Sequence, residues 1–164
     1  MKRFIGILCA VLMIGMLMTA CSDNNSSDKA ASVSADASLT DIYSEIKSEV
    51  TLPEMLEFTD VDRLDRNYGI TEDMVDEFAG GIDSSGTAIN EIVLIKAKDA
   101  DSAAEIEKKL NNRLESLLKQ SRNYRPEEAE ELEKCKVEKN DMYVSKIVST
   151  EAEKITEIYK KHFK

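Results

Sequence analysis

The sequence predicts an α+β domain in which an antiparallel or mixed sheet of three or four strands is packed with helices and preceded by short N-terminal helices. The first supporting observation is the stretch from Asn90 to Leu118, where an apolar strand runs directly into a long amphipathic helix. The second is the C-terminal end of the chain, where two strand patterns are followed by another helical pattern. The predicted order is therefore helices, with a short strand left open after them, then strand, helix, strand, strand and helix.

A targeting segment precedes this domain. Residues 1–20 start with two basic residues and continue as an apolar run, which predicts a signal peptide. The run ends in Met18-Thr19-Ala20-Cys21, which resembles a bacterial lipobox, although Met18 stands where that motif usually has Leu. The resemblance implies cleavage before Cys21 and acylation of its thiol, because the thiolate is the nucleophile in thioether formation. The alternative is an uncleaved anchor helix, and both outcomes place the domain on the extracytoplasmic face of a membrane.

Residues 21–38 are predicted to be a flexible tether. They are mainly Ser, Asp, Asn and Ala, without any aromatic residue, so they cannot bury enough apolar surface to fold. A coil of this length has a root-mean-square reach of roughly 20–25 Å. Two acyl chains on Cys21 would therefore anchor the domain close to the cell membrane, and residues 39–164 form that single domain.

The N-terminal part of the domain carries several helix-start signals. Ser38 and Asp41 fit a capping box, and apolar residues then recur on one helical face up to Val50. Pro53 stands at a first-turn position of a second helix, and Thr59 with Asp62 caps a short helix that ends at Gly69. Thr71 is expected to start a further helix. Its inward residues would be Val75, Phe78 and Ala79.

A Gly/Ser segment precedes the central strand. Gly80, Gly81 and Gly86 flank Ser84 and Ser85, which predicts a turn or hairpin loop. A phosphate-binding loop is the sharper alternative, but no Gly-Lys-Ser/Thr follows and the next element is a strand. These five residues are still the candidate ligand loop, because exposed loops carry function.

The central strand spans residues 90–98, with the apolar run Ile92 to Ile95 at its middle. A strand that is apolar on both faces is expected to be covered on both sides. Residues 99–102 supply a turn and an N-cap for the long helix. The apolar residues on the inner face of that helix recur at helical spacing. They are Ala103, Ile106, Leu110, Leu114 and Leu117.

The C-terminal third predicts a hairpin and a final helix. Pro126 starts a short acidic helix that ends near Leu132. Cys135 and Val137 then alternate with charged residues, which indicates a half-buried strand, and a turn at Asn140 leads into a second strand. Thr150 and Glu153 form a second predicted capping box. The inner face of the helix that follows is Ala152, Ile155, Ile158, Tyr159 and Phe163.

No residue pattern indicates a metal, a cofactor or a catalytic group. Asp60, Asp62 and Asp65 do not fit a calcium loop, because Gly and the bidentate Glu are missing at the required positions. His162 is explained by the C-terminal end of a helix, where the dipole favours a cation. Cys135 is predicted to be an inert core thiol.

The formal net charge of −10 limits the classes of partner. An acidic surface repels phosphates, so neither nucleic acid nor an anionic lipid headgroup is an expected direct partner. The membrane is reached only through the lipid at Cys21.

Several segments of the domain also resemble a known family. These are Leu52-Pro53-Glu54-Met55, Tyr68-Gly69-Ile70, Ala79-Gly80-Gly81-Ile82 and the strand from Glu91 to Asp99 with its capped helix. They resemble a family of small uncharacterised lipoproteins of Gram-positive bacteria, described as a domain of unknown function, over roughly residues 40–163. The resemblance implies a location and a fold, but no activity and no catalytic residues.

Two classes of function therefore stay open. The first is a non-enzymatic module of the cell envelope that binds a peptide, a glycan or another envelope protein, which predicts an exposed apolar patch or sheet edge. The second is a carboxylate-based envelope hydrolase, which predicts a pocket with converging acids of raised pKa.

Overall fold

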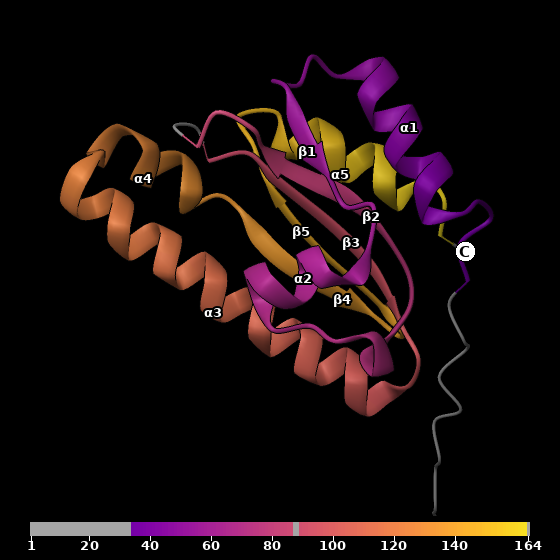
Figure 1. Ribbon diagram of the computed structural model, residues 1–164. Coiled ribbons are helices and arrows are strands. Elements are labelled where there is room, and N and C mark those ends of the chain that lie inside the picture. The colour runs from indigo at the N-terminus through magenta and orange to yellow at the C-terminus, as the bar shows by residue number, and fades with distance from the viewer. Residues whose placement is uncertain (1–33, 87–88, 164) are drawn as a thin grey trace, which may run out of the picture. The chain divides into compact units, whose positions relative to one another are not determined.

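The computed structural model describes residues 34–86 and 89–163. The predicted signal peptide, Cys21 and most of the predicted tether lie outside the described residues. The described chain is built on a five-stranded antiparallel sheet with the strand order β1-β2-β3-β5-β4 (Figure 1). In chain order these strands are β1 (Met55–Glu57), β2 (Val75–Asp83), β3 (Glu91–Ala97), β4 (Lys136–Asn140) and β5 (Tyr143–Val148). The α+β class is confirmed, but the predicted number of three or four strands is wrong.

β3 lies at the centre of the sheet, between β2 and β5. The four residues from Ile92 to Ile95 have no exposed surface. Ile92 and Leu94 belong to the core on one face of the sheet, whereas Val93 and Ile95 belong to the core on the other. The prediction of a strand covered on both sides is therefore confirmed.

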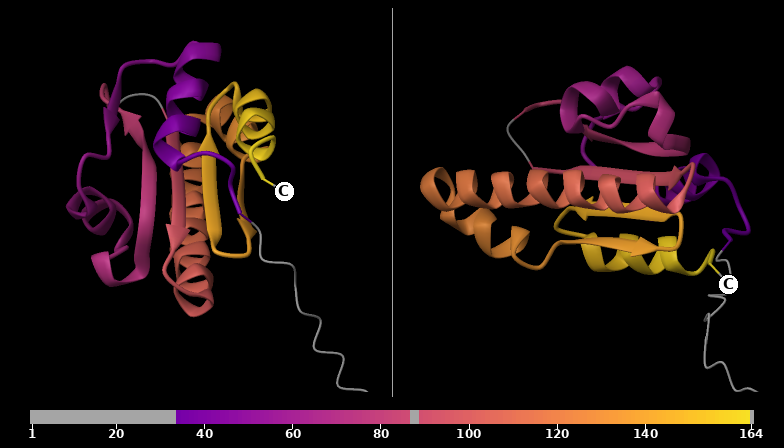
Figure 2. Two further views of the ribbon diagram at one scale, coloured as in Figure 1. Left: turned by 90° about the vertical axis from the view of Figure 1, so that its right-hand side faces the viewer. Right: turned by 90° about the horizontal axis from the view of Figure 1, so that it is seen from below.

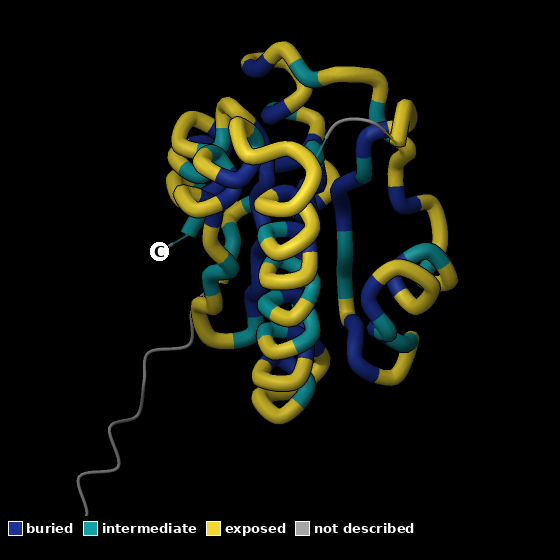
Figure 3. The backbone as a smooth tube through the Cα atoms, turned by 90° about the vertical axis from the view of Figure 1, so that its left-hand side faces the viewer, coloured by how far each residue is buried: buried dark blue, intermediate teal, exposed yellow. Residues whose placement is uncertain are grey.

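Helices pack on both faces of the sheet. α1 (Leu39–Glu49) and α5 (Ala152–Lys160) cover the face that carries Ile92, and α2 (Val61–Tyr68) and α3 (Ala100–Tyr124) cover the face that carries Val93. Figure 2 shows α3 running along the sheet, with α5 on the other side of it. The side of α3 that faces away from the sheet is exposed (Figure 3).

Two smaller helices complete the chain. α4 (Pro126–Leu132) follows α3 and packs against its end, and the short 3₁₀ helix η1 (Glu72–Met74) leads into β2. No helix among residues 34–86 and 89–163 is long and apolar enough to cross a membrane.

Several of the predicted helix ends are confirmed. Ser38 accepts a hydrogen bond from the Asp41 N–H at the start of α1, and Asp99 accepts one from Ser102 at the start of α3. Gly69 ends α2 in the left-handed conformation, at φ 67°. Glycine adopts this conformation without a steric penalty, which explains its position there.

Two predicted N-caps are wrong. Asp60, not Thr59, caps α2 by accepting a hydrogen bond from Arg63. α5 begins after Glu151 without any side-chain cap, so the predicted capping box of Thr150 and Glu153 does not form.

The predicted helix after Thr71 is also wrong, because residues 75–83 form β2. The pairing of β2 with β3 is irregular between Val75 and Glu77, as in a β-bulge. A bulge adds one residue and reverses the alternation of side chains, so Val75 and Phe78 lie on the same face of the sheet. The resulting spacing of three residues imitates that of a helix.

The segment around Pro53 is likewise an edge strand instead of a helix. β1 pairs with β2 in register Leu56↔Ile82. A Cβ atom added to Gly81 would lie 2.9 Å from the Leu56 carbonyl oxygen. Gly81 therefore permits the close approach of β1 to β2.

Candidate functional site

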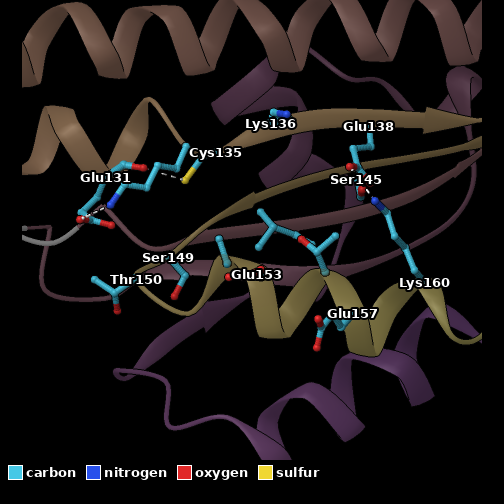
Figure 4. Close-up of a pocket in the computed structure, with 14 residues that line it drawn as sticks. Glu131, Cys135, Lys136, Glu138, Ser145, Ser149, Thr150, Glu153, Glu157 and Lys160 are labelled. Carbon is cyan, nitrogen blue, oxygen red and sulfur yellow. Dashed lines mark hydrogen bonds and ion pairs between the residues drawn. The ribbon is translucent and has the colours of Figure 1, made fainter.

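An open cavity of about 590 Å³ lies between α5 and strands β4 and β5, and we call it the α5 groove (Figure 4). Its lining combines hydroxyl, carboxylate and ammonium groups on a partly apolar floor. The lining residues are Glu131, Lys134, Cys135, Lys136, Glu138, Ser145, Ile147, Ser149, Thr150, Ala152, Glu153, Thr156, Glu157 and Lys160.

The floor of the α5 groove follows from strand register. Lys136 pairs with Ile147 and Glu138 pairs with Ser145, so these four side chains share the face of the sheet that α5 covers. α5 packs over β5 through Ile155 and leaves β4, the last strand of the sheet, uncovered. The groove is therefore the strip of sheet between the helix and the sheet edge.

Two smaller cavities adjoin the groove, because they share lining residues with it. A mostly apolar cavity of about 260 Å³ shares Cys135 and Ser149 and includes Leu132 and Val148. A cavity of about 230 Å³ at the other end shares Glu138, Ser145 and Lys160. Its other lining residues are Asn140 and the aromatic residues Tyr143, Tyr159 and Phe163.

An ion pair separates the groove from the aromatic cavity. Lys160 Nζ on α5 lies 2.8 Å from Glu138 Oε1 on β4, and Figure 4 shows the lysine reaching toward the strand. The two side chains are 56% and 37% exposed. An ion pair this exposed contributes at most about 1 kcal/mol, so a ligand could displace it at little cost.

Cys135 lies at the edge of the groove and is buried and free, as predicted. Its Sγ donates a hydrogen bond of 3.5 Å to the Glu131 carbonyl oxygen. Burial raises the pKa of the thiol. Because the thiolate is the reactive form, these surroundings make Cys135 a poor nucleophile.

The structure divides the predicted ligand loop. Gly80 and Gly81 are buried in β2, so their placement in a loop is wrong. Ser84, Ser85 and Gly86 form the exposed turn after β2, and the Asp83 carboxylate accepts the Ser85 N–H at 2.8 Å.

Gly86 borders a separate cavity of about 470 Å³ on the side of α3, together with Arg113 and Arg125. Ligand binding by Ser84, Ser85 and Gly86 stays a prediction. The structure does not bring this turn together with the α5 groove.

A buried ionic cluster lies on the face of the sheet covered by α2 and α3. Lys146 from β5 bonds to Glu91 from β3, and Arg113 Nη2 lies 2.5 Å from the same carboxylate. The Tyr68 hydroxyl donates to Glu91 Oε2 at 3.3 Å, and Lys146 Nζ lies 4.7 Å from the centre of the Tyr68 ring. No pattern in the sequence predicts this cluster.

The cluster shifts the pKa of its members. Burial lowers the pKa of Lys146 to about 8, although Glu91 acts in the opposite direction. Burial alone would raise the pKa of Glu91, but Lys146 and Arg113 outweigh it and lower the pKa. The Lys146 side chain has no exposed surface and cannot reach a substrate, so we assign the pair a structural role.

His162 has two partners that sequence analysis did not identify. Its Nδ1 lies 2.9 Å from Asp36 Oδ1 and its Nε2 lies 2.8 Å from Glu45 Oε2. Both partners are acceptors, so only the protonated ring donates to both. The contact joins residues 34–38, at the end of the predicted tether, to the C-terminus, where Ala35 also pairs with Phe163.

Asp60, which does not fit a calcium loop by sequence, is the N-cap of α2 in the structure. Among the residues that the structure describes, no group of three or more His, Cys, Asp and Glu side chains is arranged to bind a metal ion.

A comparison with protein families finds a match to the domain. Residues 48–149 match a family model described as a domain of unknown function (DUF4358). This confirms the resemblance to a domain of unknown function. No curated protein and no solved structure matches the chain.

Proposed function

Because the chain belongs to the DUF4358 family, a domain of unknown function, we propose its role from the cavities of the fold itself. We propose that the protein is exported, acylated at Cys21 and attached to the cell membrane, and that its domain binds a peptide, a glycan or another envelope protein without catalysis. A bacterial lipoprotein origin belongs to the same proposal, and its support is the lipobox pattern that ends at Cys21.

The single observation that carries the binding role is the α5 groove. It is open to solvent, lies beside an edge strand and has groups of both charges around hydroxyls such as Ser145 and Thr156. Adjoining apolar cavities extend it at both ends. A concave surface with apolar ends and a few converging polar groups is the usual form of a binding site.

The alternative is a carboxylate-based hydrolase. Its nearest candidates are Glu153 and Glu157, which line the groove one helical turn apart on α5. A carboxyl group that donates a proton near neutral pH needs a raised pKa. Among the residues that the structure describes, the pKa of Glu45, Asp73, Glu91 and Asp99 is lowered, and none of these four lines the groove.

Attachment through Cys21 fits the place where the chain joins the domain. Ala35 donates a hydrogen bond of 3.3 Å to the Tyr143 hydroxyl, and Tyr143 lines the aromatic cavity next to the groove. A tether from the membrane would therefore join the domain beside the groove, which places the groove within reach of other envelope components.

Photo-crosslinking in intact cells tests the binding role. A benzoylphenylalanine residue replaces Thr156 in the groove of the full-length protein, and a matched control replaces Lys108 on the exposed side of α3. We expect a specific adduct with one envelope component from Thr156 and none from Lys108.

The same adducts from both positions, or no adduct from Thr156, would contradict the proposal. The double variant Glu153→Gln, Glu157→Gln distinguishes the hydrolase from a binding protein. If the protein is a hydrolase, this variant still binds its substrate but no longer cleaves it, so the adduct formed from position 156 contains uncleaved substrate.

A further inference from the structure

β4 is an unpaired edge of the sheet. It is the last strand in the order β1-β2-β3-β5-β4, and no other described segment forms a ladder with its outer side. A two-residue loop joins β4 to β5, between the paired residues Asn140 and Tyr143. The pair that flanks such a loop exchanges hydrogen bonds, and bonded and non-bonded pairs alternate along an antiparallel ladder. The backbone N–H and C=O of Val137 therefore face away from β5.

The side chains at the middle of β4 are complementary to themselves. Lys136 and Glu138 stand on either side of Val137 in the strand, and both line the α5 groove (Figure 4). Antiparallel pairing of two copies about Val137 places Lys136 of each copy opposite Glu138 of the other, on the same face of the joined sheet. A two-fold symmetric interface requires such self-complementarity, because the same residues supply both sides.

The charges also select this register among those that the backbone allows. Residues whose N–H and C=O face outward must lie opposite each other, so the pairing is centred on Val137 or on a residue beside it. A centre at Glu138 places this carboxylate opposite its own copy, and a centre at Lys136 does the same with two ammonium groups. Like charges directly opposite each other destabilise a strand pair, whereas opposite charges stabilise it. Only the centre at Val137 brings opposite charges together in both flanking pairs.

The ion pairs within one chain do not block this pairing. Glu138 Oε1 lies 2.8 Å from Lys160 Nζ, and a carboxylate has a second oxygen that can accept from another donor. Lys136 is exposed and forms no ion pair within the described part of the chain. Lys139 Nζ lies 3.8 Å from Glu107 of α3, on the opposite face of the sheet. The two residues that would pair across the interface are therefore both able to do so.

We propose that a second copy of the chain occupies this edge, with β4 paired to β4 about Val137, so that two five-stranded sheets join into one. Each copy carries a net charge of −10, but salt screens repulsion beyond about 8 Å at physiological ionic strength, so the contacts at the strand decide the pairing. Val137 is half-buried by the core on the side of α3, and its own copy covers more of it.

The pairing also changes the α5 groove, because β4 forms its outer floor. Lys136 and Glu138 of the second copy continue that floor beyond the edge, and the two grooves lie side by side on the same face of the joined sheet. The proposal goes beyond the binding role, because it gives each groove residues from both copies.

Site-specific disulfide formation tests the register. Lys136 and the Glu138 that faces it form a pair without backbone hydrogen bonds, whose Cα atoms are about 4.5 Å apart, within the range that a disulfide spans. Lys136→Cys and Glu138→Cys are introduced separately into the full-length protein, which is purified in detergent and oxidised with copper phenanthroline. We expect about tenfold more covalent dimer from the mixture of the two variants than from either alone. The matched control mixes Lys108→Cys with Glu115→Cys, both on the exposed side of α3, and should give no excess.

Charge reversal tests the pairing without a covalent bond. Lys136→Glu alone and Glu138→Lys alone each place like charges opposite each other in both flanking pairs. We expect each to weaken self-association about tenfold in sedimentation equilibrium. A mixture of the two variants restores both opposite-charge pairs and should associate as tightly as the wild type, which a misfolded variant could not do. Lys108→Glu makes the same charge change on exposed α3 and should leave self-association unchanged.

A wild type that stays monomeric at every concentration would overturn the proposal, and so would a mixture of the charge variants that does not recover. More covalent dimer from Glu138→Cys alone than from the mixture would show a centre at Glu138 and refute the charge pairing. None of these results alters what Thr156 captures in cells, so the binding role is judged separately.

Discussion

Lys146 and Glu91 form an ion pair inside the protein. The lysine side chain has no exposed surface, and the glutamate side chain is 7% exposed. The two residues come from neighbouring strands at the centre of the sheet. Arg113 and Tyr68 complete the hydrogen bonding of the carboxylate. The pair therefore joins two residues that are 55 positions apart in the sequence.

Removal of Glu91 should cost more stability than removal of Lys146. Glu91→Gln leaves the buried Lys146 ammonium without its counter-charge, and we expect the free energy of unfolding to fall by about 3–5 kcal/mol. Lys146→Met leaves Glu91 paired with Arg113 and should cost less. Urea unfolding of both variants checks the order, and an equal or reversed loss would contradict the assignment.

Acid should destabilise the protein through Glu91. Its pKa in the folded state lies below the ordinary value of 4.5, so its contribution is fully present above pH 4.5 and is lost as the pH falls through the folded pKa. Unfolding midpoints in urea, measured from pH 6 to pH 3, should fall more steeply for the wild type than for Glu91→Gln. Parallel curves would contradict this role.

Mild alkali should not destabilise the protein through Lys146. The pKa of this lysine is about 8 in the fold against an ordinary 10.5. The unfolded chain therefore binds more protons between these values, and by linkage stability rises with pH in this window. The urea midpoint of the wild type should rise relative to that of Lys146→Met between pH 8 and pH 10, and a relative fall would show the opposite shift.

Gly80 should tolerate no side chain. A Cβ atom there would lie 1.9 Å from the Ile92 carbonyl oxygen, and φ is +130°. We expect Gly80→Ala to cost about 3 kcal/mol or more. Gly86→Ala is the control, because Gly86 has φ +66° but open space around it, so only backbone strain of about 1 kcal/mol applies. Thermal unfolding of both variants compares them, and similar losses would refute the contact.

Cys135 should be unreactive in the native protein. Its thiol is buried and its pKa is raised by that burial, so little thiolate is exposed to a reagent. Iodoacetamide should modify it only in urea, whereas a Lys108→Cys control should react under native conditions. Rapid modification of Cys135 in the folded wild type would reopen a role as nucleophile.

The sequence pattern was sufficient for the elements with simple periodicity. β3 and α3, the β4–β5 hairpin and α5 all appear close to their predicted positions, because a long apolar run, a capped helical repeat and an alternating pair are local signals. β2 was missed because its bulge between Val75 and Glu77 produces a helix-like spacing. β1 is only three residues long, too short for any periodicity to show.

The candidate site was less predictable. The α5 groove depends on how far α5 lies from the sheet edge, which is a tertiary property. Lys146 sits among buried residues of β5, and that is a local signal of a partner, but nothing in the sequence identifies Glu91 as that partner. The two carboxylates that face His162 were missed for the same reason, since Asp36 and Glu45 are more than a hundred positions away.

An envelope partner is available only to an exported, anchored chain, so the proposed function depends first on where the domain is. Mass spectrometry of the mature N-terminus from the membrane fraction tests this most directly. We predict a chain that begins at Cys21 and carries a diacylglyceryl thioether, and a Cys21→Ser variant released from the membrane. A full-length chain with an unmodified Cys21, recovered from the cytosol, would contradict the proposal.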